Sequence, residues 1–193
     1  MATAPRLATY AILAANCAAF TACVAANDGN AGQIGRSLLL RYGAISQATL
    51  PGHEYWRLIA CAFLHAGIAH LAANMICLLS WGGLVEERTG TWPFVLIYLA
   101  AAIGGSLASI AGHSSPFLSI GASGAISGLI GALLALALLR KFPFDAQFFA
   151  ANILFNIVLV SQNPGIDWLA HLGGMIAGLA AALVLHVAGL LTR

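Results

Sequence analysis

Charged residues are scarce in this sequence. Eight Lys and Arg and six Asp and Glu make up only 7% of the 193 residues, while hydrophobic residues make up 61%. Soluble domains carry about 25% charged residues. So few charged side chains cannot cover a particle in water, and we expect most of the surface to face lipid. The chain is predicted to be an integral membrane protein.

Other scarcities exclude further classes of function. The net charge is only +2 and the chain has no cluster of Lys and Arg, so no nucleic-acid partner is expected. The four cysteines form no CxxC pair and have no partner ligands at short spacing. They are therefore interpreted as small buried side chains and not as a metal site.

Long apolar runs are what the chain has instead. A membrane-spanning helix needs about 20 mostly apolar residues. Six windows approach this length: residues 7–26, 67–85, 92–111, 121–139, 146–160 and 168–191. The first resembles a signal peptide because Arg6 precedes it, but its apolar run exceeds the usual 7–15 residues. We predict an all-α membrane protein in which residues 1–193 form one bundle of six transmembrane helices.

Basic residues predict the orientation of this bundle. They divide into two groups, one for each side of the membrane: Arg6, Arg88, Arg140, Lys141 and Arg193 on one side, and Arg36, Arg41 and Arg57 on the other. By the positive-inside rule the larger group faces the cytoplasm, which places both termini there. The long connection of residues 27–66 then lies outside. Its Trp56-Arg57 pair suits the membrane interface.

Polar side chains within the predicted spans are costly, so each needs a reason. The second, fourth and sixth spans all enter the membrane from the outer side. His70 and Asn74 lie early in the second span, Ser123 begins the fourth, and His171 lies about one turn into the sixth. Four polar groups from three distant segments therefore reach a similar depth near the outer face.

Ser123 is the candidate nucleophile, within the string Gly121-Ala122-Ser123-Gly124. Small residues also serve close helix packing, and Gly124 with Gly128 forms a GxxxG spacing, so that alternative stays open. A loop containing glycine and proline precedes Ser123, which predicts a position at a helix N-terminus. Backbone N–H groups lack helical partners there, and the helix dipole is positive. Such donors stabilise the oxyanion of acyl transfer.

His171 is the candidate base. Two glycines follow it, which allows its helix to approach another closely. If its packing partner is the helix that begins at Ser123, the His171 imidazole can accept the serine proton. His70 and Asn74 share one helix face and can donate hydrogen bonds to an oxyanion. The alternative is that these three polar residues tie neighbouring helices together.

The sequence lacks the residues that other classes of protease need. Asp167 lies four positions before His171 and can face the same side, but a Ser–His dyad is the simpler hypothesis. The Glu of an HExxH zinc motif is absent beside His65, so a zinc protease is excluded. The predicted spans contain no pair of Asp residues, which argues against an aspartyl protease.

Taken in order, these residues resemble the rhomboid family of intramembrane serine proteases, over about residues 56–185. The matching positions are the aromatic–arginine pair Trp56-Arg57, the HxxxxHxxxN residues His65, His70 and Asn74, the ExR residues Glu86 and Arg88, the GxSG residues Gly121, Ser123 and Gly124, and His171. One position departs from the pattern. Many relatives carry an aromatic residue four positions after the serine that packs near the histidine, whereas this chain has Ser127.

The resemblance implies a water-accessible cavity open to the outer face and a Ser123–His171 dyad without an acidic partner. His70, Asn74 and the Ser123 N–H are expected to form the oxyanion hole. The implied activity is endopeptidase cleavage of transmembrane segments near their outer end. No metal or organic cofactor is implied. The expected partners are transmembrane protein substrates and the lipid bilayer, and the compact layout favours a prokaryotic plasma membrane.

Two other functions remain open at this point. A non-catalytic rhomboid-like binder of transmembrane helices needs neither Ser123 nor His171, so the presence of both argues against it. A small transporter or channel is expected to place polar residues along a whole path across the membrane. In this sequence they collect at one depth.

Overall fold

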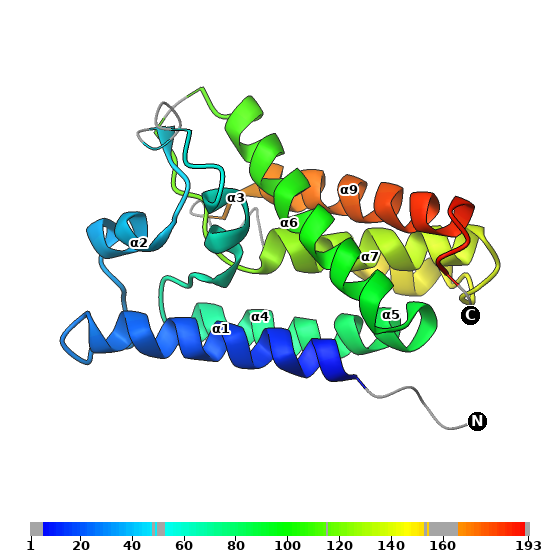
Figure 1. Cartoon of the computed structure of the whole chain (residues 1–193), viewed down its shortest axis with the longest axis horizontal. Helices are drawn as coiled ribbons and strands as arrows, with labels where there is room; N and C mark the ends of the chain where they lie inside the picture. Colours follow the sequence, from blue (N-terminus) through cyan, green and yellow to red (C-terminus); the bar gives the residue numbers. More distant parts are fainter. Residues whose placement is uncertain are drawn as a thin grey trace.

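Four helices of the structure, a computed structural model, are long and apolar enough to cross a membrane (Figure 1). The structure describes residues 6–47, 49, 53–114, 116–152, 154 and 166–191. The four are α1 (Leu7–Ala25), the continuous helix Ile68–Thr89, α6 (Thr91–Gly112) and α9 (Trp168–Val187). The second of these is built from α4 (Ile68–Cys77), a π-helical turn η3 (Leu78–Gly82) and α5 (Gly83–Thr89). The protein is therefore an all-helical membrane protein within the part that is described.

Most predicted boundaries agree with these helices to within two residues, with two corrections. The sixth span was predicted to reach residue 191, but α9 ends at Val187 because Gly189 adopts a left-handed φ of +72° and turns the chain. The second span was predicted to end at residue 85, but its helix continues to Thr89. The fifth prediction, 146–160, is described only as a helix over residues 146–152 and at 154; its remainder lies outside the described residues.

The helix α7 (Ser123–Leu138) is shorter than its neighbours and lies inside the bundle. It has 16 residues, most of them buried, and a helix of that length extends about 24 Å. The hydrocarbon core of a bilayer is about 30 Å thick. At least one end of α7 must therefore lie below the membrane surface.

Glycines bring α9 into backbone contact with α7. A Cβ added at Gly174 would lie 2.0 Å from the Gly124 carbonyl oxygen, and one added at Gly178 would lie 2.1 Å from that of Gly128. Only glycine fits where two helix backbones approach so closely. The GxxxG spacing predicted for packing is thus used, and it aligns the two helices over a full turn.

The connection between α1 and α4 is folded around one arginine. Arg57, at the start of α3 (Arg57–Ala60), is buried, and its Nη1 donates to the carbonyls of Leu40 at 2.6 Å and Ala44 at 3.1 Å. Its guanidinium also lies over the Trp56 ring, 4.6 Å from the centroid. The pair therefore ties α3 to the carbonyls at the end of α2 (Arg36–Tyr42).

The two ends of the bundle carry different basic residues, as the sequence predicts. At one end Arg6 pairs with Glu87 at 2.7 Å, and the Arg88 Nη1 donates to the Lys141 carbonyl at 3.4 Å. The N-terminal end of α1 and the C-terminal end of α9 both lie toward this side of the molecule (Figure 1). Arg36 and Arg57 lie at the other end, where α7 begins. This division is the arrangement that the positive-inside rule needs.

Candidate active site

Ser123 is the first residue of α7, as predicted. The loop before it is bonded to the backbone of residues in the connection between α1 and α4. Ile45 and Ser119 exchange two backbone hydrogen bonds of 3.1 and 2.8 Å, and the Gly121 N–H donates to the Cys61 carbonyl at 2.9 Å. These contacts anchor the loop to the connection of residues 27–66 between α1 and α4. The tertiary structure therefore fixes where α7 starts.

The N-terminus of α7 has no side-chain cap. Its N-cap residue is Ala122, which offers no hydrogen-bonding side chain to the first N–H groups. An N-terminus without a cap leaves donors available and carries a partial positive charge. Gly121 adopts a left-handed φ of +106° immediately before it, a conformation that favours glycine.

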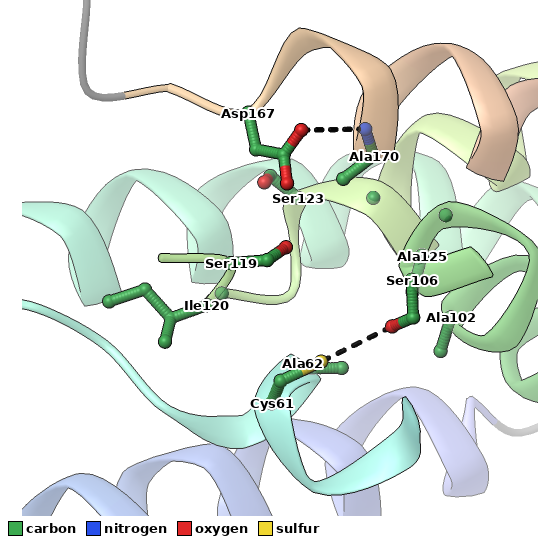
Figure 2. A pocket seen from close by; sticks show the side chains of 13 residues that line it. Cys61, Ala62, Ala102, Ser106, Ser119, Ile120, Ser123, Ala125, Asp167 and Ala170 are labelled. Atoms are coloured by element: carbon green, nitrogen blue, oxygen red, sulfur yellow. Dashed lines mark hydrogen bonds between the residues drawn. The ribbon is translucent and has the colours of Figure 1, made fainter. Parts of the chain in front are cut away.

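A pocket opens beside these donors. Its cavity volume is only about 20 Å³, room for roughly one water molecule. Its lining residues come from the 3-10 turn Cys61–Phe63, from α6, α7 and α9, and from the loops before α7 and α9 (Figure 2). The polar or titratable members are Cys61, Ser106, Ser119, Ser123 and Asp167. An oxyanion in this pocket would face the start of α7 and the Ser123 side chain.

His70 points its Nε2 toward Gly121, beside Ser123. A Cβ added at Gly121 would lie 2.8 Å from the His70 Nε2 and 3.8 Å from the Ser123 Oγ. The Ala66 N–H donates to the His70 Nδ1 at 3.4 Å. A neutral ring that accepts at Nδ1 carries its proton on Nε2. His70 therefore presents an N–H donor beside Ser123, which suits the predicted oxyanion role.

Asn74 lies one turn further along α4. Its Nδ2 donates to the His70 carbonyl at 2.9 Å. One of the two amide hydrogens is used in this way, and the second is left for another acceptor. The bond also orients the Asn74 side chain along the helix toward His70.

His171 is buried in the first turns of α9. Gly124, which follows Ser123, lies against Ala170, which precedes His171. A Cβ added at Gly124 would lie 3.1 Å from the Ala170 carbonyl oxygen. Ser123, His70 and His171 thus gather at one end of the bundle. Within the described chain, however, the pocket lining includes Ser123 but not His70, Asn74 or His171.

The remaining predicted motif residues lie apart from the pocket. Glu86 is fully buried near the opposite end, where its carboxylate accepts from the N–H groups of Ala8 and Thr9 at 2.9 and 2.8 Å. It therefore caps α1. Arg88 stacks over Phe142 in the same region. These two positions support the bundle and do not contact the pocket.

His65 packs against His70. It is fully buried, and the two rings meet edge to face with centroids 5.0 Å apart. Burial, with a smaller contribution from His70, lowers the pKa of His65 to about 3. The ring is therefore neutral at physiological pH and supports His70 by packing.

Sequence reasoning missed several lining residues. Ser106 and Cys61 line the pocket, with the Cys61 Sγ and Ser106 Oγ 3.3 Å apart. Ser106 and Ser109 lie in α6, an otherwise apolar span. Polar residues inside a span were the signal used for His70 and Ser123, and the same signal marks these serines.

Comparisons with known proteins identify the family of the chain. Residues 52–188 match the Rhomboid domain family. The chain is 42% identical over 167 residues to "Rhomboid protease GluP" of Bacillus subtilis, covering 83% of this chain and 32% of that protein. It is 34% identical over 152 residues to "RHOMBOID-like protein 5" of Arabidopsis thaliana, covering 76% of this chain and 49% of that protein.

The chain belongs to the rhomboid family. The resemblance predicted from its motifs is thereby confirmed. The chain spans about a third to a half of the length of the curated relatives it matches. The part that matches the family model, residues 52–188, contains Ser123 and His171.

Proposed function

We propose that this rhomboid-family protein is a serine endopeptidase that cleaves transmembrane segments of membrane proteins near the outer face. The observation that carries the proposal is the backbone contact between α7 and α9, which places the start of α7 beside the first turns of α9. The domain is taken to comprise residues 1–193, with six spanning helices and both termini in the cytoplasm.

Ser123 acts as the nucleophile and His171 as the base. The Ser123 oxygen attacks the scissile carbonyl carbon while His171 takes the hydroxyl proton. The carbonyl π electrons move to oxygen and form a tetrahedral oxyanion. When the C–N bond breaks, His171 gives the proton to the leaving amine, which leaves an acyl ester on Ser123. Water, deprotonated by His171, then hydrolyses the ester and restores both residues.

Donors around the oxyanion stabilise it. The His70 Nε2–H, the second Asn74 amide hydrogen and the first N–H groups of α7 are the proposed set. Removing one such donor typically costs about 2.7–4 kcal/mol of transition-state stabilisation. The absence of a cap on α7 supports this assignment, because a side chain there would compete with the oxyanion.

Cleavage of a labelled transmembrane substrate in liposomes tests the proposal. Wild type, Ser123→Ala and His171→Ala are compared, together with labelling by a fluorophosphonate. Loss of cleavage in both variants supports the dyad. Cleavage that survives Ser123→Ala refutes it. A folded wild type that neither cleaves nor labels points instead to a binder of transmembrane helices.

A further inference from the structure

Asp167 joins three parts of the active-site end of the bundle. Its Oδ1 accepts the Ala170 N–H at 3.0 Å and so caps the N-terminus of α9 (Figure 2). The Ser109 Oγ of α6 donates to its Oδ2. The same residue lines the pocket that contains Ser123. A single carboxylate thus connects α9, α6 and the pocket.

His171 depends directly on the turn that Asp167 starts. The His171 N–H donates to the Asp167 carbonyl at 3.2 Å, so both the backbone and the side chain of Asp167 define the first turn of α9. The first N–H groups of a helix have no helical partners, and an acidic N-cap supplies one. Gly173 and Gly174 follow, and glycine weakens a helix. The cap therefore matters more here than in an ordinary helix.

We propose that Asp167 is a positioning residue that fixes the His171 imidazole relative to Ser123, a role that rests on the proposed function of this site. It acts through the cap on α9 and the bond to α6. His113 lies next to the same carboxylate, with its Nε2 4.0 Å from the Asp167 Oδ1. The cap and the Ser109 bond do not require that contact.

Two substitutions separate the cap from the charge. Asparagine is as good an N-cap as aspartate, whereas alanine is not. Asp167→Asn therefore keeps the cap through its one oxygen and removes the charge, and its amide N–H can donate to the Ser109 Oγ in place of the bond that Ser109 donates to aspartate. Asp167→Ala removes the cap, the charge and the contact with Ser109. The chain offers a matched control in Asp145, whose Oδ1 accepts the N–H groups of Gln147 and Phe148 at 2.9 and 3.0 Å. That cap belongs to the helix that begins at residue 146, beyond the end of α7 opposite Ser123.

The measurement is the rate of fluorophosphonate labelling of Ser123 in the full chain in detergent, with kcat and KM for a labelled substrate. We expect Asp167→Ala to label roughly 10- to 100-fold more slowly and to lose kcat with KM unchanged. Asp167→Asn should stay within about threefold of wild type, and Asp145→Ala should label at the wild-type rate. If Asp167→Ala does not fold, Ser109→Ala keeps the cap and should slow labelling several-fold.

Three outcomes would overturn the inference. The first is that Asp167→Ala labels at the wild-type rate. The second is that Asp167→Asn labels as slowly as Asp167→Ala, which would assign the effect to charge, and the third is that Asp145→Ala labels as slowly as Asp167→Ala. Hydrogen exchange at the Ala170 amide gives a second readout. It should be faster in Asp167→Ala and unchanged in Asp167→Asn, and unchanged exchange in both refutes the cap. A folded wild type that neither labels nor cleaves refutes the proposed function instead, while the exchange result still decides the cap.

Discussion

Gly174→Ala tests whether contact between α7 and α9 sets the geometry of the catalytic pair. The new methyl group would lie 2.0 Å from the Gly124 carbonyl oxygen, whereas ordinary contact begins at 3.4 Å. Both groups belong to helix backbones, so neither can rotate away. The helices must separate by about 1.4 Å at this level, which is the level of Ser123 and His171.

The expected cost has two parts. Overpacking of this kind typically destabilises a protein by about 1–3 kcal/mol. A misplacement of about 1 Å in a catalytic pair can reduce the rate by about 100-fold. We therefore expect Gly174→Ala to remain folded with a lower midpoint of thermal unfolding, and to lose about 100-fold in kcat while KM changes little.

The assay compares kcat per folded molecule for three variants. Gly178→Ala creates a similar clash with Gly128, at 2.1 Å, one turn further along both helices from Ser123 and His171. It should lose similar stability but less activity. Gly35→Ala meets nothing closer than 3.8 Å and should behave as wild type. A Gly174→Ala protein that keeps more than a third of the wild-type kcat would refute the reasoning.

Three further predictions concern residues around the site and at the opposite end. The pKa of His65 is lowered by burial to about 3, so below pH 6.5 the unfolded chain binds a proton that the folded protein excludes. Stability should fall as pH decreases, by about 2 kcal/mol between pH 7 and pH 5, and thermal unfolding of His65→Gln should lack that part of the slope. Glu86→Ala removes the α1 cap and should lower the free energy of unfolding by about 3 kcal/mol. Glu87→Ala breaks a partly exposed ion pair and should lower it by about 1 kcal/mol or less. Unfolding in mixed micelles measures both, and equal losses of stability would contradict the role of Glu86 as a cap. His70→Ala should lower kcat by about 100-fold with little change in KM, and an unchanged kcat would remove His70 from the oxyanion hole.

Hydrophobic runs located the helices because lipid imposes a strong rule. Every backbone polar group in the hydrocarbon must be bonded within its own segment, so an uncharged run of about 20 residues has few alternatives to a helix. The ends were less predictable. The helix that begins at Ile68 passes residue 85 because Glu86 finds buried donors on α1, a contact between residues far apart in sequence.

The sequence alone determined the membrane class, the family and the candidate pair Ser123 and His171, because composition and motif spacing are local properties. What surrounds these two residues follows from the tertiary structure. It placed the Gly124 and Gly174 backbones in contact, turned the His70 Nε2 toward Gly121, and put Asp167 at the junction of α9 and α6. Those relations depend on how helices pack across the bundle, and packing partners cannot be read from any single segment.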